Sequence, residues 1–330
     1  MALLNHCGAK GSPDPSIAAA IVPARLYVHC VRCLPTTGEI TMADAVFNVE
    51  ELEHNVSDLR RKFHAAEPFQ HLVVDDLLLF SPSAARSFPD ISWPGWDELG
   101  DRYQQNKRAC ANLELIPEPF KALIRELSEP RFLRVLEQIT GIQRLLPDPY
   151  LMGGGLHLSG PGGILSPHTD FHYYRALNLY RRINVLVYLN EDWSLQDGGC
   201  LSLYDSQNRA IQTVLPDWGK VVIFRTDDQS VHGFPVPVAK GKWRRSVALY
   251  YYTAAPAGNF SGDETTYWRE HGEQAGVIRK TRFVAYRCLL NLSRVISILA
   301  HVVNPNQGVG LIRTALANRR KARCGRPEIS

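Results

Sequence analysis

The feature that most constrains the fold is a series of short apolar segments in the second half of the chain. From about residue 145 onward, apolar or alternating runs are separated by Gly, Pro and Asp; they occupy residues 154–158, 183–189, 200–204, 221–224 and 246–253. Regularly spaced short strands with turn residues between them are typical of a double-sheet jelly roll or a barrel. We therefore expect an antiparallel β core here.

Upstream of this core the periodicity is helical. Apolar residues recur at three- and four-residue spacing over residues 49–63 and again over residues 117–141, which predicts amphipathic helices. Residues 68–77 are predicted to form a strand, and residues 82–105 a long surface loop or short helices. Helices followed by strands predict an α+β fold with the helices packed on one face of the sheet.

These patterns divide the chain into segments. Residues 1–45, rich in Gly, Pro, Ala and Ser, are expected to form a loosely structured extension. Residues 46–260 are predicted to form one domain, in which a helical layer over 46–145 precedes the β core over 146–260. The remaining residues, 261–330, are predicted to form a basic helical extension.

The charge is unevenly distributed along the chain. The formal net charge is +4, yet from Arg279 to the end eleven Lys and Arg residues face a single acid, Glu328. Within the helix expected over residues 282–303, basic and polar residues follow one narrow stripe and the rest is aliphatic. Two interpretations stay open: the helix packs on its own domain or across a dimer, or it lies on an acidic membrane surface. We favour the first, and the sequence leaves the oligomeric state open.

The composition also bears on partners and compartment. Seven scattered cysteines are typical of a reducing compartment, and the pair Cys30 and Cys33 lacks the second pair of a zinc site. No basic region followed by an apolar stretch opens the chain, and no uncharged apolar run is long enough to span a bilayer. The basic run over residues 319–326 lacks interleaved aromatics, so no nucleic-acid partner is expected. We predict a cytoplasmic location.

The residues that carry chemistry begin at Ser166-Pro-His168-Thr-Asp170. Side chains i and i+2 of a strand point to the same face, so His168 and Asp170 can reach one point. A distant histidine, His232, follows an apolar strand and a polar turn. Two imidazoles and one carboxylate form the facial triad that holds non-haem Fe(II) and leaves three coordination positions free. We predict that these three residues are the catalytic iron ligands.

A further pair of residues predicts a site for an organic acid. Arg244 and Ser246 open the last apolar strand and share one face. A guanidinium fork and a hydroxyl there suit the distal carboxylate of 2-oxoglutarate. By the same alternation, Arg245 is expected to point away from the site.

These motifs occur together in a known family. Residues 68–253 resemble the prolyl 4-hydroxylase-like branch of the 2-oxoglutarate/Fe(II) oxygenases; the matching blocks are PFQHLVVDD (68–76), GGGLH (153–157), HTDF (168–171), RRINVLVYLN (181–190), DGG (197–199), HG (232–233) and RRSVALYYY (244–252). The resemblance implies a double-stranded β-helix (jelly-roll) core with an N-terminal helical layer. It also implies Fe(II), 2-oxoglutarate and O2 as reactants, with ascorbate as a reductant, and hydroxylation of an unactivated C–H bond with release of succinate and CO2.

The resemblance also implies roles for secondary positions. Asn184 lies where members of the branch place a polar contact to 2-oxoglutarate. Many members carry a Tyr at the position of Ser159, and His157, two residues earlier on the same face, is a candidate to replace it. Members often use Lys at the position of Arg244.

Several readings of the function compete. Within the family, the substrate is a prolyl residue of a peptide, free proline or another small metabolite. Outside it, the scaffold could serve a non-catalytic jelly-roll binding protein, or the His/Asp/His set could serve a zinc-dependent hydrolase. A hydrolase has no use for Arg244 and Ser246, and a binding protein has no need to keep all four elements, so the oxygenase is favoured.

Overall fold

The computed structural model of the chain describes residues 45–255, 264–268 and 277–303. The extension predicted over residues 1–45 lies almost entirely outside the described residues. Cys30, Cys33 and the basic run over 319–326 lie outside them as well.

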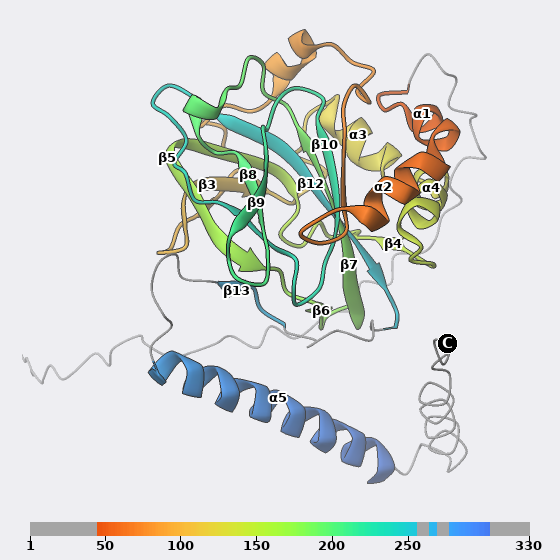
Figure 1. Ribbon diagram of the computed structural model, residues 1–330, viewed down its shortest axis with the longest axis vertical. Helices are drawn as coiled ribbons and strands as arrows, with labels where there is room; N and C mark the ends of the chain where they lie inside the picture. The colour runs from red at the N-terminus through yellow and green to blue at the C-terminus, as the bar shows by residue number, and fades with distance from the viewer. Residues whose placement is uncertain (1–44, 256–263, 269–276, 304–330) are drawn as a thin grey trace, which may run out of the picture. The chain divides into compact units, whose positions relative to one another are not determined.

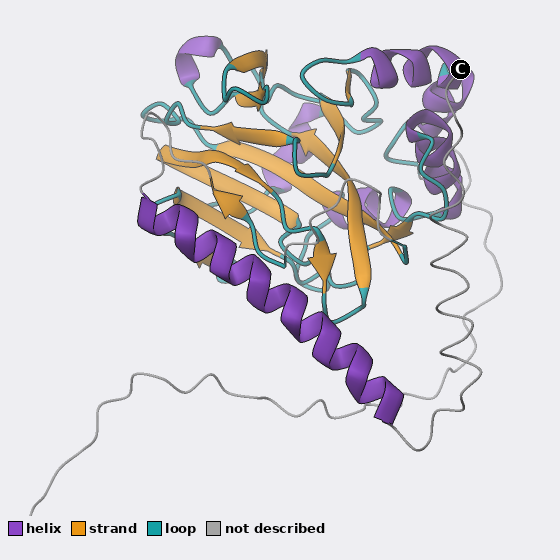
Figure 2. Ribbon diagram, turned by 60° about the horizontal axis from the view of Figure 1, so that its bottom comes forward, coloured by secondary structure: helices purple, strands orange, loops and turns teal. Residues whose placement is uncertain are grey.

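The centre of the fold is a curled antiparallel sheet (Figures 1 and 2). Its main path runs β1-β10-β7-β12-β5-β11-β8-β9, and the remaining strands pair at its margins. The strands are β1 (His71–Val74), β2 (Asp97–Leu99), β3 (Gln104–Cys110), β4 (Leu146–Pro147), β5 (Gly155–Thr169), β6 (Tyr173–Tyr174), β7 (Leu179–Tyr188), β8 (Leu201–Tyr204), β9 (Ala210–Val214), β10 (Val221–Arg225), β11 (Val231–Phe234), β12 (Arg244–Thr253) and β13 (Tyr267–Trp268).

The long strand β5 joins the two halves of this sheet. Its first part, residues 155–159, pairs with β12, whereas Leu165 and His168 in its second part pair with β11. The chain thus crosses from one layer of strands to the other without leaving β structure. The predicted jelly-roll core is confirmed.

Four helices precede most of the sheet: α1 (Val49–His54), α2 (Val56–Ala65), α3 (Phe120–Glu126) and α4 (Pro130–Thr140). Each helical region expected from the sequence is divided in two. The first is interrupted at Asn55, and the second is interrupted before Pro130, which begins α4 because proline fits the first helical turn. The interruptions let each short helix turn its apolar stripe separately toward the core.

Helices and strands share one apolar cluster. Phe63 of α2, Leu123 of α3 and Ile139 of α4 are fully buried with strand residues such as Val187. The hydroxyl of Tyr251 donates to the carbonyl of Leu127 at 2.8 Å, which ties β12 to the end of α3. The side of the sheet next to the helices is therefore the hydrophobic core, and its inner curl is left for the site.

Among the strands that were not predicted, two contribute residues to the site described below. Residues 104–110 form β3, which pairs with β5 from Gln104–Leu165 to Cys110–Leu156, although a loop was expected up to residue 105. β13 lies beyond the predicted domain boundary at 260 and still pairs with β5, with Trp268 opposite His168. The sheet therefore extends past the predicted end of the domain.

The C-terminal helix is α5 (Val277–Val303), close to the predicted range. Aliphatic side chains along it are exposed; they are Val284, Leu289, Leu292, Val295, Ile296, Leu299 and Val303. Among the described residues, no helix has the length and apolar character needed to cross a membrane.

Candidate active site

The three predicted iron ligands lie together at the curl of the sheet. His168 is near the end of β5, Asp170 follows that strand, and His232 on β11 pairs directly opposite His168. Their ligand atoms lie within 4.8 Å of one another, and all three residues are buried. Each histidine Nε2 is 3.6 Å from an oxygen of the Asp170 carboxylate.

Hydrogen bonds fix the orientation of both imidazoles. Nδ1 of His168 donates to the carbonyl of Ser166 at 2.8 Å, and Nδ1 of His232 donates to that of Ser230 at 3.0 Å. Because a carbonyl only accepts, each Nδ1 is the donor in its bond, which leaves each Nε2 as the nitrogen directed toward the other ligands. Backbone support of this kind is typical of metal-binding histidines.

The carboxylate of Asp170 is held by two neighbours on β7. Arg181 Nη2 donates to its Oδ2 at 3.0 Å, and Asn184 Nδ2 donates to the same oxygen at 2.7 Å. Burial acts to raise the pKa of Asp170, but the Arg181 guanidinium and the two imidazoles outweigh it and hold that pKa well below its usual range. The Asp170 carboxyl is therefore ionised at neutral pH, with Oδ1 left for a metal.

The donor set fits a ferrous ion. Burial and the neighbouring His168 lower the pKa of His232 to about 4, so its imidazole is neutral, as metal binding requires. Two imidazole nitrogens and one carboxylate oxygen on one side of a cavity are the ligand chemistry of the facial triad.

Arg244 and Ser246 are buried on the cavity side of β12, and the intervening Arg245 is more exposed, as the alternation predicts. Arg244 Nε donates to the carbonyl of Gly199 at 2.7 Å, and its Nη2 donates to the hydroxyl of Tyr188 at 3.0 Å. The guanidinium also lies 4.3 Å from the ring centre of Phe234. Among the described residues, no acid pairs with Arg244, so its charge is available to a ligand.

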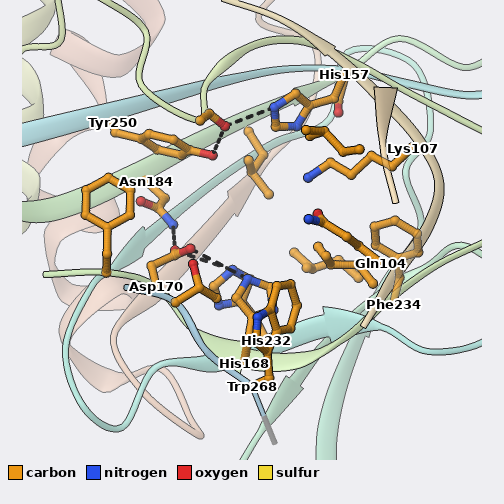
Figure 3. Close-up of a pocket in the computed structure, with 18 of the residues that line it drawn as sticks. Gln104, Lys107, His157, His168, Asp170, Asn184, His232, Phe234, Tyr250 and Trp268 are labelled. Atoms are coloured by element: carbon orange, nitrogen blue, oxygen red, sulfur yellow. Dashed lines mark hydrogen bonds and ion pairs between the residues drawn. The ribbon is translucent and has the colours of Figure 1, made fainter. Parts of the chain in front are cut away.

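All six predicted site residues line one cavity of about 220 Å³ (Figure 3). The described residues around it are Leu99, Gln104, Lys107, Gly153, His157, Leu165, His168, Asp170, Phe171, Arg181, Asn184, Leu186, Leu201, His232, Phe234, Arg244, Ser246, Tyr250, Thr266 and Trp268. The ring of Trp268 lies 4.8 Å from that of His168, so β13 covers one side of the triad.

Asn184 lines the cavity and also contacts three protein groups. Its Oδ1 accepts from Arg181 Nε at 2.8 Å and from Thr226 at 3.2 Å, while its Nδ2 donates to Asp170. Both polar atoms thus contact protein groups and support the aspartate, and the direct contact to an oxoacid implied by the resemblance stays a prediction.

His157 faces the cavity beside the predicted oxoacid site. Its Nε2 donates to the carbonyl of Gly153 at 3.0 Å. Burial, and then the charge of Lys107, lower the pKa of His157 well below its ordinary value. The imidazole is therefore neutral and adds no charge to the site.

Several site residues were missed by sequence reasoning. Tyr188 lies four residues after Asn184 on the same strand, and this even spacing was a signal that it shares the cavity face. Arg181 precedes Asn184 by three and reaches the site because β7 and β12 shift register near Tyr251. Nothing in the sequence indicated Lys107 and Gln104, because their polar segment lacks the apolar alternation that is typical of a strand.

Comparison with known proteins agrees with this geometry. Residues 154–252 match the family model described as the 2OG-Fe(II) oxygenase superfamily. The prolyl 3-hydroxylase OGFOD1 of Xenopus laevis is 30% identical over 77 residues, covering 22% of this chain and 15% of the relative. The prolyl 3,4-dihydroxylase OGFOD1 of Ostreococcus tauri is 32% identical over 83 residues, covering 22% of this chain and 16% of the relative. The matches thus span only a small part of either relative.

Solved structures were also compared. A prolyl hydroxylase from Trichoplax adhaerens, in complex with a hypoxia inducible factor peptide, aligns with a TM-score of 0.45 and 16% identity, covering 62% of this chain and 91% of that one. A Pseudomonas putida prolyl-4-hydroxylase aligns with a TM-score of 0.41 and 16% identity, covering 61% of this chain and 100% of that one. The match of residues 154–252 to the 2OG-Fe(II) oxygenase superfamily model confirms the resemblance found in the sequence.

Proposed function

We propose that this protein is an Fe(II)- and 2-oxoglutarate-dependent dioxygenase that hydroxylates an unactivated C–H bond. One observation carries the proposal: the paired Nε2 atoms of His168 and His232 and the carboxylate of Asp170 converge on one side of a cavity. Arg244, which has no acidic partner among the described residues, lines the same cavity. A metal and a dicarboxylate can therefore bind together.

The residues divide the work between two ends of the cavity. His168, Asp170 and His232 would hold the metal, and Arg181 and Asn184 keep the carboxylate of Asp170 in place. Arg244 and Ser246 would bind the distal carboxylate of 2-oxoglutarate through charge-assisted hydrogen bonds. When bound, Fe(II) and 2-oxoglutarate supply the oxidising chemistry, in which O2 is consumed and succinate and CO2 are released.

The names of the relatives support a proposal for the substrate class. The curated relatives are named as prolyl hydroxylases, so we propose a prolyl residue or a small metabolite as the group that is hydroxylated. We further propose a cytoplasmic location, which the scattered cysteines support, and ascorbate as the reductant that keeps the iron ferrous.

Succinate release from 2-oxoglutarate tests the proposal. We expect the wild type to release succinate when Fe(II) is present and to stop when it is chelated. His168→Ala and Asp170→Ala should abolish release, and Arg244→Met should raise the 2-oxoglutarate requirement roughly 100-fold, since a buried charged hydrogen bond is lost. Lys62→Met, on the exposed face of α2, serves as the control and should change neither quantity. Undiminished turnover in Asp170→Ala, or succinate release that persists without metal, would contradict the proposal.

A further inference from the structure

Strand β3 places a cation, Lys107, in the cavity. The proposed binding of the metal and of 2-oxoglutarate gives this cation no role. Lys107 pairs across β5 with Ser159, and Ser159 pairs on its other side with Arg244. The three residues therefore form one row on the cavity face. Strands lie about 4.8 Å apart, so the backbones of Lys107 and Arg244 are roughly 10 Å apart. They are two separate cationic positions.

The side chain of Lys107 points into the open part of the cavity. Figure 3 shows Lys107 and Gln104 reaching in from one wall, with Asp170, Asn184 and Tyr250 on the opposite wall. Within the described residues, the Lys107 ammonium has no hydrogen-bond or ion-pair partner. The Gln104 amide donates only a long bond, 3.4 Å, to Asp101, so it retains a free N–H.

The charges of the cavity leave an excess of positive charge that a further anion would offset. Its described walls carry three cations at neutral pH, Lys107, Arg181 and Arg244, and one carboxylate, Asp170. The two charges of a ferrous ion are balanced by the two of 2-oxoglutarate. Two positive charges therefore remain after both have bound, and a neutral substrate would cover Lys107 without pairing it. Burying an unpaired ammonium is costly, whereas a second anion would offset the charge.

Lys107 is protonated under ordinary conditions. Burial and the charges of Arg244 and Arg181 lower its pKa to about 8, opposed by Asp170 and Asp101. The ammonium remains the main form at neutral pH, and an ammonium binds carboxylates well. His157, which also faces this space from β5, is neutral and does not compete for the anion.

We propose that Lys107, with Gln104 beside it, binds the carboxylate of the substrate that is hydroxylated. The substrate is then a small carboxylic acid, such as a free amino acid. A cavity of about 220 Å³ that also takes up 2-oxoglutarate leaves room for a molecule of this size. This inference rests on the proposed function and narrows its substrate class.

The test uses the full-length protein loaded with Mn(II) and 2-oxoglutarate, and acetate as the probe. Bound Mn(II) relaxes the methyl protons of a nearby small molecule, and acetamide is the neutral probe of the same shape. We expect acetate to be relaxed at least tenfold more strongly than acetamide in the wild type. Lys107→Met and Lys107→Gln should remove that difference, Lys107→Arg should retain it, and the surface control Lys62→Met should leave it unchanged.

The affinity for 2-oxoglutarate separates the possible outcomes. It should stay within twofold of the wild type in Lys107→Met, which also shows that the variant is folded. A tenfold loss would assign Lys107 to the cosubstrate and overturn the inference. So would acetate relaxation that survives in Lys107→Met, or equal relaxation by the two probes in the wild type. Failure of the wild type to bind Mn(II) and 2-oxoglutarate together would instead overturn the proposed function, and this inference with it.

Discussion

At the scale of single residues, the site depends on side chains that hold other side chains. Asn184 illustrates this most clearly, because one amide joins Arg181, Thr226 and Asp170 in a buried network. A buried amide in an otherwise apolar strand needs polar partners. The resemblance implied that 2-oxoglutarate is the partner of Asn184. In the structure, protein groups contact both polar atoms of this amide. Residue type and strand position therefore predicted that Asn184 needs polar partners, but not the protein groups that provide them.

Substitution of Asn184 distinguishes the two roles. We expect Asn184→Ala to weaken Mn(II) binding 10- to 100-fold, the usual effect of removing support from a metal ligand. The 2-oxoglutarate affinity at saturating Mn(II) should change little. Thr226→Val is the matched control, since it removes one donor to Asn184 but leaves the bond to Asp170. Titration calorimetry measures both affinities. A loss of affinity confined to 2-oxoglutarate would instead support a direct contact between Asn184 and 2-oxoglutarate.

At the scale of elements, a strand could be predicted from the sequence where its apolar residues form a recognisable run or alternation. Apolar strands such as β7, β10 and β12 were found because their side chains are buried in the sheet. β3 was not found, because Gln104-Gln-Asn-Lys-Arg108 shows no apolar alternation and its structure depends on pairing with β5. β13, of only two residues, is likewise defined by its partner strand. His168 and Asp170 were predictable because i, i+2 spacing places their side chains on one face, whereas Lys107 and Gln104, on the facing wall, come from the unpredicted strand β3.

The turn before β8 links local structure to the site. Gly198 has φ 64° and a Cβ there would lie 2.0 Å from the carbonyl of Pro237, while the next carbonyl, of Gly199, holds Arg244. We expect Gly198→Ala to lower the free energy of unfolding by about 3 kcal/mol, from positive φ and from the clash. Gly241→Ala, with φ 82° and open space around it, should cost about 1 kcal/mol. Chemical denaturation measures both, and equal losses would show that the close approach to Pro237 is not limiting.

At the scale of the whole molecule, the cavity is built from a defined part of the chain. Its described lining residues lie between Leu99 and Trp268, and the helices α1 to α4 pack on the core beside them. The predicted boundary at 260 excludes β13, although the ring of Trp268 lies 4.8 Å from that of His168. We propose that the functional unit runs from residue 45 to at least residue 268.

Shortening the chain tests this boundary. A chain of residues 45–276 should bind Mn(II) and 2-oxoglutarate within about twofold of the full-length protein, because it keeps both ends of the cavity and the core beneath them. A further cut to 45–260 removes β13 and should weaken metal binding by exposing His168. If the 45–276 chain loses 2-oxoglutarate binding while remaining folded by circular dichroism, then residues outside this range complete the site.

The position of a bound metal tests the central claim most directly. Crystals grown with Fe(II) under anaerobic conditions would show the ion by its anomalous scattering. The account predicts one strong peak about 2.0–2.2 Å from His168 Nε2, His232 Nε2 and Asp170 Oδ1, with 2-oxoglutarate reaching from it toward Arg244. A peak elsewhere, or iron-saturated protein with no peak between these three side chains, would contradict it.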